Sequence, residues 1–382
     1  MPKTPIVALS KDLARALRQG HPWVFRDALA GKPDIPAGGL VVVADRRGRE
    51  IAFGYWDQRS PIAVRVLDLA PIPDARALVR DRLRTALSMR QARIDLRATN
   101  AFRWVHGEAD RLPGIHVDVY ADVASVRFDG EGSRAFYADL PSLLLECGSE
   151  LGLRKVVDRE ARGHDSEEVE VIEHGVRFIV DVGRGQKGGL FLDQRENRLA
   201  VARLAAGKSV LNLFGYTGGF SLHAAAAGAA RSDTVDIARP AIAAARRNFE
   251  LNRFDLGKAG FHVADVFTFL DEAIAAGRAW DIVICDPPSF APSQKSLPLA
   301  RKSYLRLHRL AARVVARGGL LCAASCSSHV SRSEFLALVD AGVRQAGRSF
   351  ALRTYAGAGP DHPTLPTFPE GDYLKFALGK VR

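Results

Sequence analysis

The feature that most constrains this sequence is a regular alternation, after Gly183, of apolar runs, glycine turns and helical segments. Two strands joined through a helix run parallel, because the crossover returns the chain to the same end of the sheet. The alternation therefore predicts five parallel core strands, and two final apolar runs predict an antiparallel hairpin that closes the sheet. The predicted core strands are 209–214, 233–236, 260–264, 280–285 and 319–325, and the hairpin strands are 350–355 and 373–378.

The start of the chain follows a different pattern. A polar helical start at 11–19 precedes strand-like runs at 40–44, 50–56 and 62–67, and the Gly and charged turns between these runs predict a small β-barrel. A stretch with two prolines at 70–74 ends the barrel and is expected to act as a linker.

The middle of the chain predicts an α+β unit. An arginine-bearing helix at 74–97 and a second helix at 135–147 are expected. The accompanying strands are 102–105, 115–120, 123–128, 155–159 and 176–181. Because 382 residues exceed the usual size of one hydrophobic core, we expect several domains. The predicted domain boundaries are 1–72, 73–183 and 184–382.

A glycine turn joins the first core strand to an alanine-rich helix. Gly215 and Gly218 let a ligand approach the backbone, and the helix that follows offers free N–H groups. The turn lacks the three-glycine spacing that seats a pyrophosphate, which argues against a nicotinamide dinucleotide.

Three acids follow successive core strands. Asp236 comes 21 residues after Gly215, where a carboxylate can accept both hydroxyls of a ribose. Asp265 is placed to accept the amino group of adenine, and Asp286 ends the fourth strand. A single Asp after a strand is commonly a helix cap or a turn residue. Three of them at one edge of a sheet, however, line one crevice and predict a nucleoside pocket.

The fourth strand runs into the turn Asp286-Pro287-Pro288-Ser289-Phe290, which holds a carboxylate rigidly at the sheet edge. This turn resembles the motif of nucleic-acid-base methyltransferases, which lies beside an unstacked target base. The resemblance implies S-adenosylmethionine as the cofactor.

A thiol ends the fifth strand. Thiolate addition from Cys326 to carbon 6 of a pyrimidine would make carbon 5 nucleophilic, and Asp286 would hydrogen-bond the cytosine edge. Free cysteine is usually a small buried apolar residue, which is our interpretation of Cys322 and Cys285. His329 is a candidate base, against the commoner outcome of a loop histidine that only meets solvent.

From end to end the chain resembles the bacterial 23S ribosomal RNA cytosine-C5 methyltransferases of the RlmI type. The likeness covers 21–25, 107–114, 185–198, 361–363 and 370–375. It implies a Rossmann-like class I α/β methyltransferase domain with a mostly parallel seven-stranded sheet, preceded by a PUA β-barrel that binds RNA and an α+β central domain. Gly188 stands where the family usually has Thr, so this position offers no side-chain hydroxyl for a contact.

The resemblance also assigns site residues, with Cys326 as the nucleophile and Asp286 as its catalytic partner. The expected cofactor pocket consists of Asn212, Phe214, Gly215, Tyr216, Thr217, Gly218, Asp236, Ile237, Asp265, Val266, Asp286 and Gln194. The expected substrate-binding residues are Pro287, Pro288, Ser289, Phe290, Lys302 and Arg306. Ser289 occupies the region where some other families have a second cysteine that assists release, so release must rely on another base.

Basic side chains outnumber acidic ones by 54 to 43, a net charge of +11 that favours a polyanionic partner such as large-subunit ribosomal RNA. A high-GC genome, which encodes arginine often, would give the same excess of basic residues. A predicted helix at 301–317 repeats basic residues at helical spacing on one face, either to contact phosphates or simply as a solvated face.

Two other functions stay open, namely an N-methyltransferase acting on RNA (for example guanine N7) or protein, and a non-catalytic RNA-binding factor. The four cysteines form no CxxC pair, so no metal is expected. Charged residues interrupt the N-terminus and no long apolar run follows, which favours a cytoplasmic protein with no membrane partner. A homodimer is compatible with the sequence.

Overall fold

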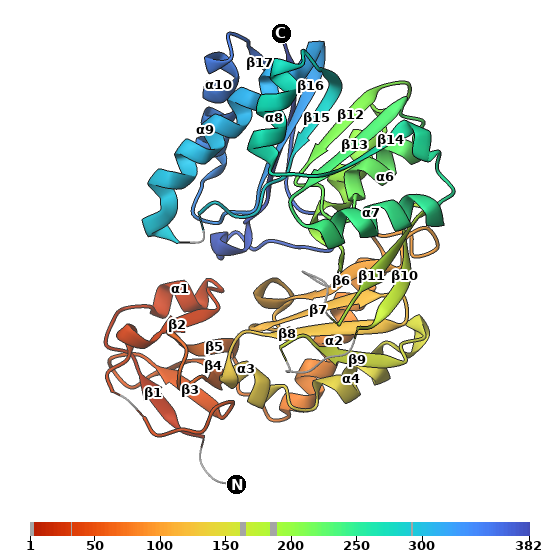
Figure 1. The fold of residues 1–382 in the computed structure, drawn as a ribbon. Helices are drawn as coiled ribbons and strands as arrows, with labels where there is room; N and C mark the ends of the chain where they lie inside the picture. The colour runs from red at the N-terminus through yellow and green to blue at the C-terminus, as the bar shows by residue number, and fades with distance from the viewer. Residues whose placement is uncertain (1–3, 32, 161–165, 184–188, 292) are drawn as a thin grey trace. The chain divides into compact units, whose positions relative to one another are not determined.

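The computed structural model describes residues 4–31, 33–160, 166–183, 189–291 and 293–382. The chain forms two compact units (Figure 1). Unit 1 contains Met1–Val169, Asp181–Arg184 and Pro360–Gly371, and unit 2 contains Glu170–Val180, Gly185–Gly359 and Asp372–Arg382. The connection between the last two strands of the chain therefore leaves unit 2, enters unit 1 and returns.

Unit 1 begins with a five-stranded sheet in the order β1-β3-β4-β5-β2. Its strands are β1 Ile6–Ala8, β2 Trp23–Phe25, β3 Leu40–Ala44, β4 Glu50–Trp56 and β5 Ile62–Asp68, with helix α1 at Ala14–Arg18. Apolar side chains such as Val24, Val43 and Trp56 form its buried core. The three predicted strands are confirmed. The short strands β1 and β2 were missed, because three residues give no readable alternation.

The second sheet of unit 1 has the order β6-β7-β8-β9. Its elements are β6 Ala101–His106, β7 Ile115–Tyr120, β8 Val123–Phe128, β9 Lys155–Asp158, α2 Ala75–Gln91, α3 Glu131–Phe136 and α4 Leu140–Cys147. The single predicted helix at 135–147 is wrong. Pro141 lies in the first turn of α4, where its missing N–H costs no hydrogen bond, so a new helix begins there. The predicted helix at 74–97 is confirmed as α2, but it ends at Gln91.

Unit 2 is built on a seven-stranded sheet in the order β14-β13-β12-β15-β16-β18-β17. Its strands are β12 Ser209–Leu213, β13 Arg231–Asp236, β14 Ala259–Val263, β15 Trp280–Cys285, β16 Val315–Ser325, β17 Phe350–Ala356 and β18 Lys375–Val381. The first five pair in parallel, and β18 is antiparallel to both of its neighbours. The predicted parallel core with a closing hairpin is confirmed. The order reverses direction at β12 and β15, which creates the crevice where such sheets bind ligands.

Helices cover both faces of this sheet (Figure 1). The helices of unit 2 are α5 Arg195–Ala202, α6 Gly219–Ala226, α7 Arg239–Leu251, α8 Val266–Ala275, α9 Leu297–Val314 and α10 Arg332–Gln345. One buried cluster joins the α8, α9 and α10 side to Val283 and Leu321, and another joins the α5 and α6 side to Ile284 and Cys322. The predicted C-terminal boundary of the basic helix at 301–317 is wrong. Helix α9 ends at Val314, and β16 begins at Val315.

A small two-stranded sheet pairs β10 Glu168–Glu173 with β11 Val176–Asp181. The sequence pattern indicated β11 but missed β10.

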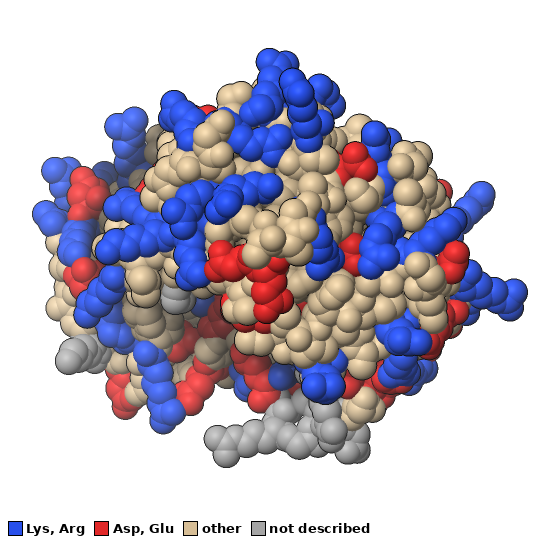
Figure 2. Space-filling view, turned by 45° about the horizontal axis from the view of Figure 1, so that its top comes forward, with Lys and Arg blue, Asp and Glu red and all other residues tan. Residues whose placement is uncertain are grey.

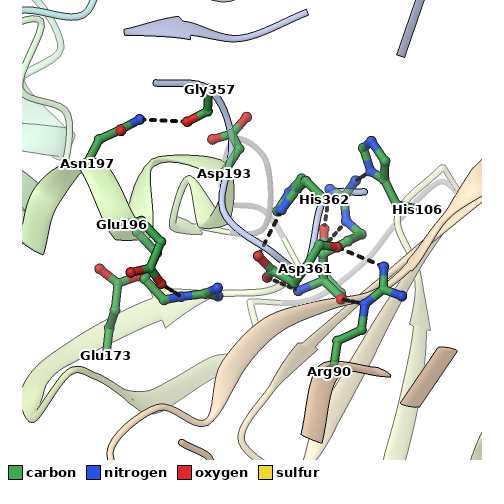
Figure 3. A network of polar contacts seen from close by, with 12 residues as sticks. Arg90, His106, Glu173, Asp193, Glu196, Asn197, Gly357, Asp361 and His362 are labelled. Carbon is green, nitrogen blue, oxygen red and sulfur yellow. Dashed lines mark hydrogen bonds and ion pairs between the residues drawn. The ribbon is translucent and has the colours of Figure 1, made fainter. Parts of the chain in front are cut away.

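Within unit 1, the segment between β17 and β18 is anchored through Asp361 (Figure 3). Its carbonyl accepts from Arg90 Nη2 at 2.7 Å, and its Oδ2 accepts from the backbone N–H of Arg103 at 2.9 Å.

A buried histidine makes unit 2 sensitive to acid. His308 of α9 packs against Tyr304 and Phe335, and burial lowers its pKa to about 4. The unfolded chain takes up this proton near pH 6.5, so the stabilisation is complete above that pH and is lost as pH falls toward 4. Acidification from pH 7 to pH 5 should lower the free energy of unfolding of both proteins. We expect this decrease to be about 2 kcal/mol smaller in His308→Leu than in the wild type. Thermal unfolding at both pH values measures this difference, and equal losses in the two proteins would contradict it.

Candidate active site

The turn after β12 has an unusual backbone. Phe214 and Tyr216 have φ of 56° and 47°, which non-glycine residues rarely adopt. A Cβ on Gly215 would lie 2.5 Å from Cγ2 of Thr234, so only glycine fits between the two strands. The chain is thus held in a tight loop at the start of α6, as expected for a ligand-binding turn.

Asp236 fixes this loop from the tip of β13. Its Oδ2 accepts from the N–H of Tyr216 at 2.9 Å, and its Oδ1 accepts from the N–H of Ala238 at 2.8 Å. The next side chain, Ile237, is 72% exposed, although large apolar residues are usually buried. Together they offer a carboxylate and an apolar surface at the strand tip, which suits a ribose and its base.

The neighbouring acid, Asp265, has the role of a helix cap. Its Oδ1 accepts from the N–H of Thr268 at 3.0 Å at the start of α8. Among the described residues, the hydrogen bonds of this cap involve Oδ1 and not Oδ2, which leaves a carboxylate oxygen for a ligand at this strand tip. Val266, predicted beside the cofactor, places its side chain in the hydrophobic core.

Two predicted pocket residues carry buried polar atoms that lack a hydrogen bond within the described part of the chain. These atoms are Asn212 Oδ1 and Gln194 Nε2. The amide nitrogen Nδ2 of Asn212 donates to Ser221 Oγ. The amide oxygen Oε1 of Gln194 accepts from Nδ2 of Asn197. A buried polar atom without a partner is costly, so both positions fit a polar ligand such as the predicted cofactor. Thr217, five residues after Asn212, is buried, and Gly218 is the N-cap of α6 with a φ of 85°.

The four cysteines lie in different environments. Cys285 and Cys322 are fully buried, and burial raises the pKa of both thiols, which makes them inert packing residues. Cys147 is also buried, whereas Cys326 is partly exposed just beyond the end of β16. Asp286 occupies the equivalent place beyond β15 and is also partly exposed.

A chain of hydroxyl groups connects these two strand tips. Ser289 and Ser327 join their Oγ atoms at 2.9 Å, so the proline turn is tied to the residue after Cys326. The hydroxyl of Tyr304, on α9, lies 2.7 Å from Ser325 Oγ and 3.2 Å from Ser327 Oγ. Both residues that flank Cys326 are therefore fixed.

Cys326 and Asp286 both influence the pKa of the Tyr304 phenol. Burial raises the pKa of this phenol, and the negative charges of Cys326 and Asp286 raise it further. Tyr304 consequently stays neutral at physiological pH. Of the other substrate residues predicted in this turn, Pro287 is buried, Pro288 is exposed and Phe290 packs against Tyr304 with ring centres 5.0 Å apart. His329 is exposed in the following turn.

Sequence reasoning missed Lys375 at the start of β18. Its ammonium is buried and donates to the carbonyls of Ser327 and Tyr373. The signal that could have found it is a lysine followed directly by an apolar strand, since lysine is almost never fully buried without a specific partner.

The basic residues of α2 and α9 differ in how many ion pairs they form. On α2, Arg76, Arg80 and Arg84 share the carboxylate of Glu146, and Arg76 also pairs with Asp139, so two negative charges partly offset these three positive ones. On α9, Arg306 approaches Asp271 at 3.5 Å, but three exposed cations have no ion pair among the described residues. They are Lys302, Arg309 and Arg313. Figure 2 shows that Lys and Arg side chains are abundant on the face it presents.

Within the described residues, no group of three or more potential ligands could hold a metal ion. No helix in that part of the chain is long and apolar enough to span a membrane. The position where Gly188 replaces the usual Thr lies outside the described residues.

Comparisons with known proteins agree with this geometry. Residues 158–361 match the family model of S-adenosylmethionine-dependent methyltransferases, and residues 7–69 match that of PUA-like domains. Ribosomal RNA large subunit methyltransferase I of Alteromonas mediterranea is 34% identical over 98% of both chains, and that of Escherichia coli is 32% identical over 97% of both. A methyltransferase structure from Streptococcus mutans aligns with a TM-score of 0.81 at 21% identity, covering 99% of this chain and 100% of that one.

The fold and the strand-tip site define this protein as an S-adenosylmethionine-dependent methyltransferase. A second aligned structure, a methyltransferase complexed with S-adenosylhomocysteine, has a TM-score of 0.82 at 22% identity over 99% of both chains. Within this class, the chain belongs to the family of ribosomal RNA large subunit methyltransferase I.

Proposed function

We propose that this protein methylates carbon 5 of a cytosine in 23S ribosomal RNA through a covalent adduct with Cys326. The observation that carries the proposal is the environment of this thiol. Cys326 is the one cysteine of the chain that is not buried, and hydroxyl bonds tie its neighbours to the turn that follows Asp286. The name of these relatives, ribosomal RNA large subunit methyltransferase I, supports the choice of substrate.

Residues at the tips of β12, β13 and β14 would hold the cofactor. Asp236 and Asp265 supply carboxylate oxygens for its nucleoside, and Asn212 Oδ1 and Gln194 Nε2 supply polar atoms that need a partner. When bound, S-adenosylmethionine supplies an electrophilic methyl group and leaves as S-adenosylhomocysteine. The loop locked by Asp236 keeps these groups in place before the ligand arrives, which reduces the entropy lost on binding.

The chemistry at the base is assigned to Cys326 and Asp286. The Sγ thiolate adds to carbon 6, and the electron pair moves to carbon 5, which can then accept a methyl group. Asp286 hydrogen-bonds the cytosine edge and supports protonation at N3 during this addition. A base takes up the carbon 5 proton, and the electron pair of that C–H bond forms the double bond to carbon 6 as the bond from Sγ to carbon 6 breaks. Return of the N3 proton to its donor then restores the cytosine ring, and Sγ leaves as the free thiolate.

The direct test is nucleoside analysis of the RNA product. Purified protein is incubated with S-adenosylmethionine and large-subunit RNA from a strain that lacks the gene, and the digested RNA is analysed by mass spectrometry. We expect one new 5-methylcytidine and no N-methylated nucleoside. A new N-methylguanosine would instead assign the protein to the N-methyltransferases, and absence of any new methyl group would refute activity on this RNA.

We further propose that the unpaired cations of α9 contact RNA phosphates. Replacing Lys302, Arg309 and Arg313 together by Gln should lower RNA affinity and reduce the slope of log K against log salt by about 2 to 3, because each phosphate contact contributes about 0.7 to 0.9. Filter binding over a range of salt concentrations measures the slope. In the matched control, Gln replaces Arg76, Arg80 and Arg84, which are already paired with Glu146. An equal loss of slope in both triple variants would refute a specific contact by α9.

A further inference from the structure

Lys375 occupies an unusual place for a lysine. Its side chain is 2% exposed, and its Nζ donates to the carbonyl oxygens of Ser327 and Tyr373. Lys375 also pairs with Ser325 in the antiparallel register of β16 and β18. The ammonium therefore contacts the residue after Cys326, and its backbone pairs with the residue before it.

The buried ammonium has few charges to compensate it. Asp372 lies nearby but already forms a two-bond ion pair with Arg332, at 2.9 Å for each bond. Burial lowers the pKa of Lys375 to about 8, while the negative charges of Asp372 and Cys326 act in the opposite direction and Arg332 adds to the lowering. At neutral pH the lysine thus keeps its proton and its positive charge.

Other titratable groups face the same segment. Asp286, beyond β15, and Cys326 both raise the pKa of the Tyr304 phenol on α9, so they share this neighbour. A carboxylate near a thiol opposes its ionisation. Tyr304 itself is neutral because burial raises the pKa of its phenol. Arg332 is engaged by Asp372. Among the described residues, Lys375 is thus a buried cation that contacts the Cys326 segment directly, through the carbonyl of Ser327.

We propose that Lys375 is a positioning residue that fixes the Ser325 to Ser327 segment and stabilises the thiolate form of Cys326. The thiol loses its proton to solvent, and Lys375 keeps its own, so no bond to Lys375 is made or broken. A desolvated cation close to a thiol favours the thiolate more strongly than it would in water. The inference rests on the proposed role of Cys326 as the nucleophile, for which it explains how the reactive form is populated.

The test measures the thiol without RNA or cofactor. The rate of Cys326 alkylation by iodoacetamide is followed against pH in the full chain, with Cys326→Ala as the background for the three buried cysteines. We expect half-maximal reactivity of the wild type below pH 8.5, the ordinary value for a free thiol. Lys375→Met should raise that midpoint by about one pH unit or more, which lowers the rate at pH 7 about tenfold.

Two further variants keep the test specific. Lys380→Met removes a partly exposed lysine at the other end of β18, opposite Leu320, and should leave the profile unchanged. Lys375→Arg keeps the charge and should stay within about threefold of the wild type. An unchanged midpoint in a folded Lys375→Met protein would overturn the inference. If that variant does not fold, a wild-type midpoint at or above pH 8.5 would overturn it equally.

Failure of this inference can be distinguished from failure of the proposed function. A shifted thiol midpoint together with RNA that gains no 5-methylcytidine would leave the role of Lys375 intact and refute the reaction. Formation of 5-methylcytidine together with an alkylation profile that does not depend on Lys375 would refute this inference alone.

Discussion

Cys326→Ala is expected to abolish methyl transfer to RNA while leaving cofactor binding intact. Without the thiolate, carbon 5 of cytosine stays a poor nucleophile, so we expect kcat to fall on the order of 10³-fold or more. The measurement is transfer of radiolabelled methyl groups to RNA, together with calorimetric titration by S-adenosylmethionine. Cofactor affinity should change less than about twofold, because the turn after β12 and Asp236 are untouched.

The matched control for this variant is Ser328→Ala. Ser328 is exposed two residues further along the same turn, so its loss tests the backbone conformation without removing a reactive group. Its turnover should equal that of the wild type. Normal turnover in Cys326→Ala would mean that the thiol only packs against its neighbours, and the N-methyltransferase alternative would then replace the present proposal.

Asp236→Ala is expected to weaken cofactor binding strongly. The substitution deletes the carboxylate that accepts the N–H groups of Tyr216 and Ala238, and it also deletes the proposed ribose acceptor. Hydrogen bonds to a charged group contribute about 1.5 to 3 kcal/mol each, so we expect the Kd for S-adenosylmethionine to rise about 10²-fold or more.

Asp255→Ala provides the control for this loss. Asp255 also accepts a backbone N–H, that of Gly257, but it lies at the opposite end of β14 from Asp265. Calorimetry should therefore give nearly wild-type affinity for Asp255→Ala. Comparable weakening in the two variants would show that loss of stability, and not loss of a ligand contact, is responsible.

The sheet of unit 2 could be predicted well, because most of its core strands are short runs rich in apolar residues, and four of the five are followed closely by a glycine or end beside an acid. The same alternation placed Cys285 and Cys322 in the interior and Cys326 at the strand tip, and their burial agrees with that expectation. Helix ends were less predictable. A proline in the first turn of α4 and the early start of β16 changed two of them.

Long-range pairing could not be predicted from one sequence. Glu173 is a clear example, since its buried carboxylate binds Arg198 and His223, which follow at separations of 25 and 50 residues. No local pattern relates such residues. A lysine followed by an apolar strand could have indicated that Lys375 is buried, but its contact with Ser327 could not be predicted, because that contact depends on β18 pairing with β16. The partners of the α2 arginines could not be read from the sequence either, because Asp139 and Glu146 lie more than 60 residues further along the chain.

Covalent trapping on fluorinated RNA tests the central claim most directly. When carbon 5 of cytosine carries fluorine, Cys326 can add and the methyl group can be accepted, but no proton is present at carbon 5 to be removed, so the adduct persists. We predict that wild-type protein with S-adenosylmethionine and RNA containing 5-fluorocytidine forms a complex stable in detergent, with the RNA attached at Cys326 in peptide mass spectra. Wild-type protein that methylates ordinary RNA but forms no such complex would contradict the account.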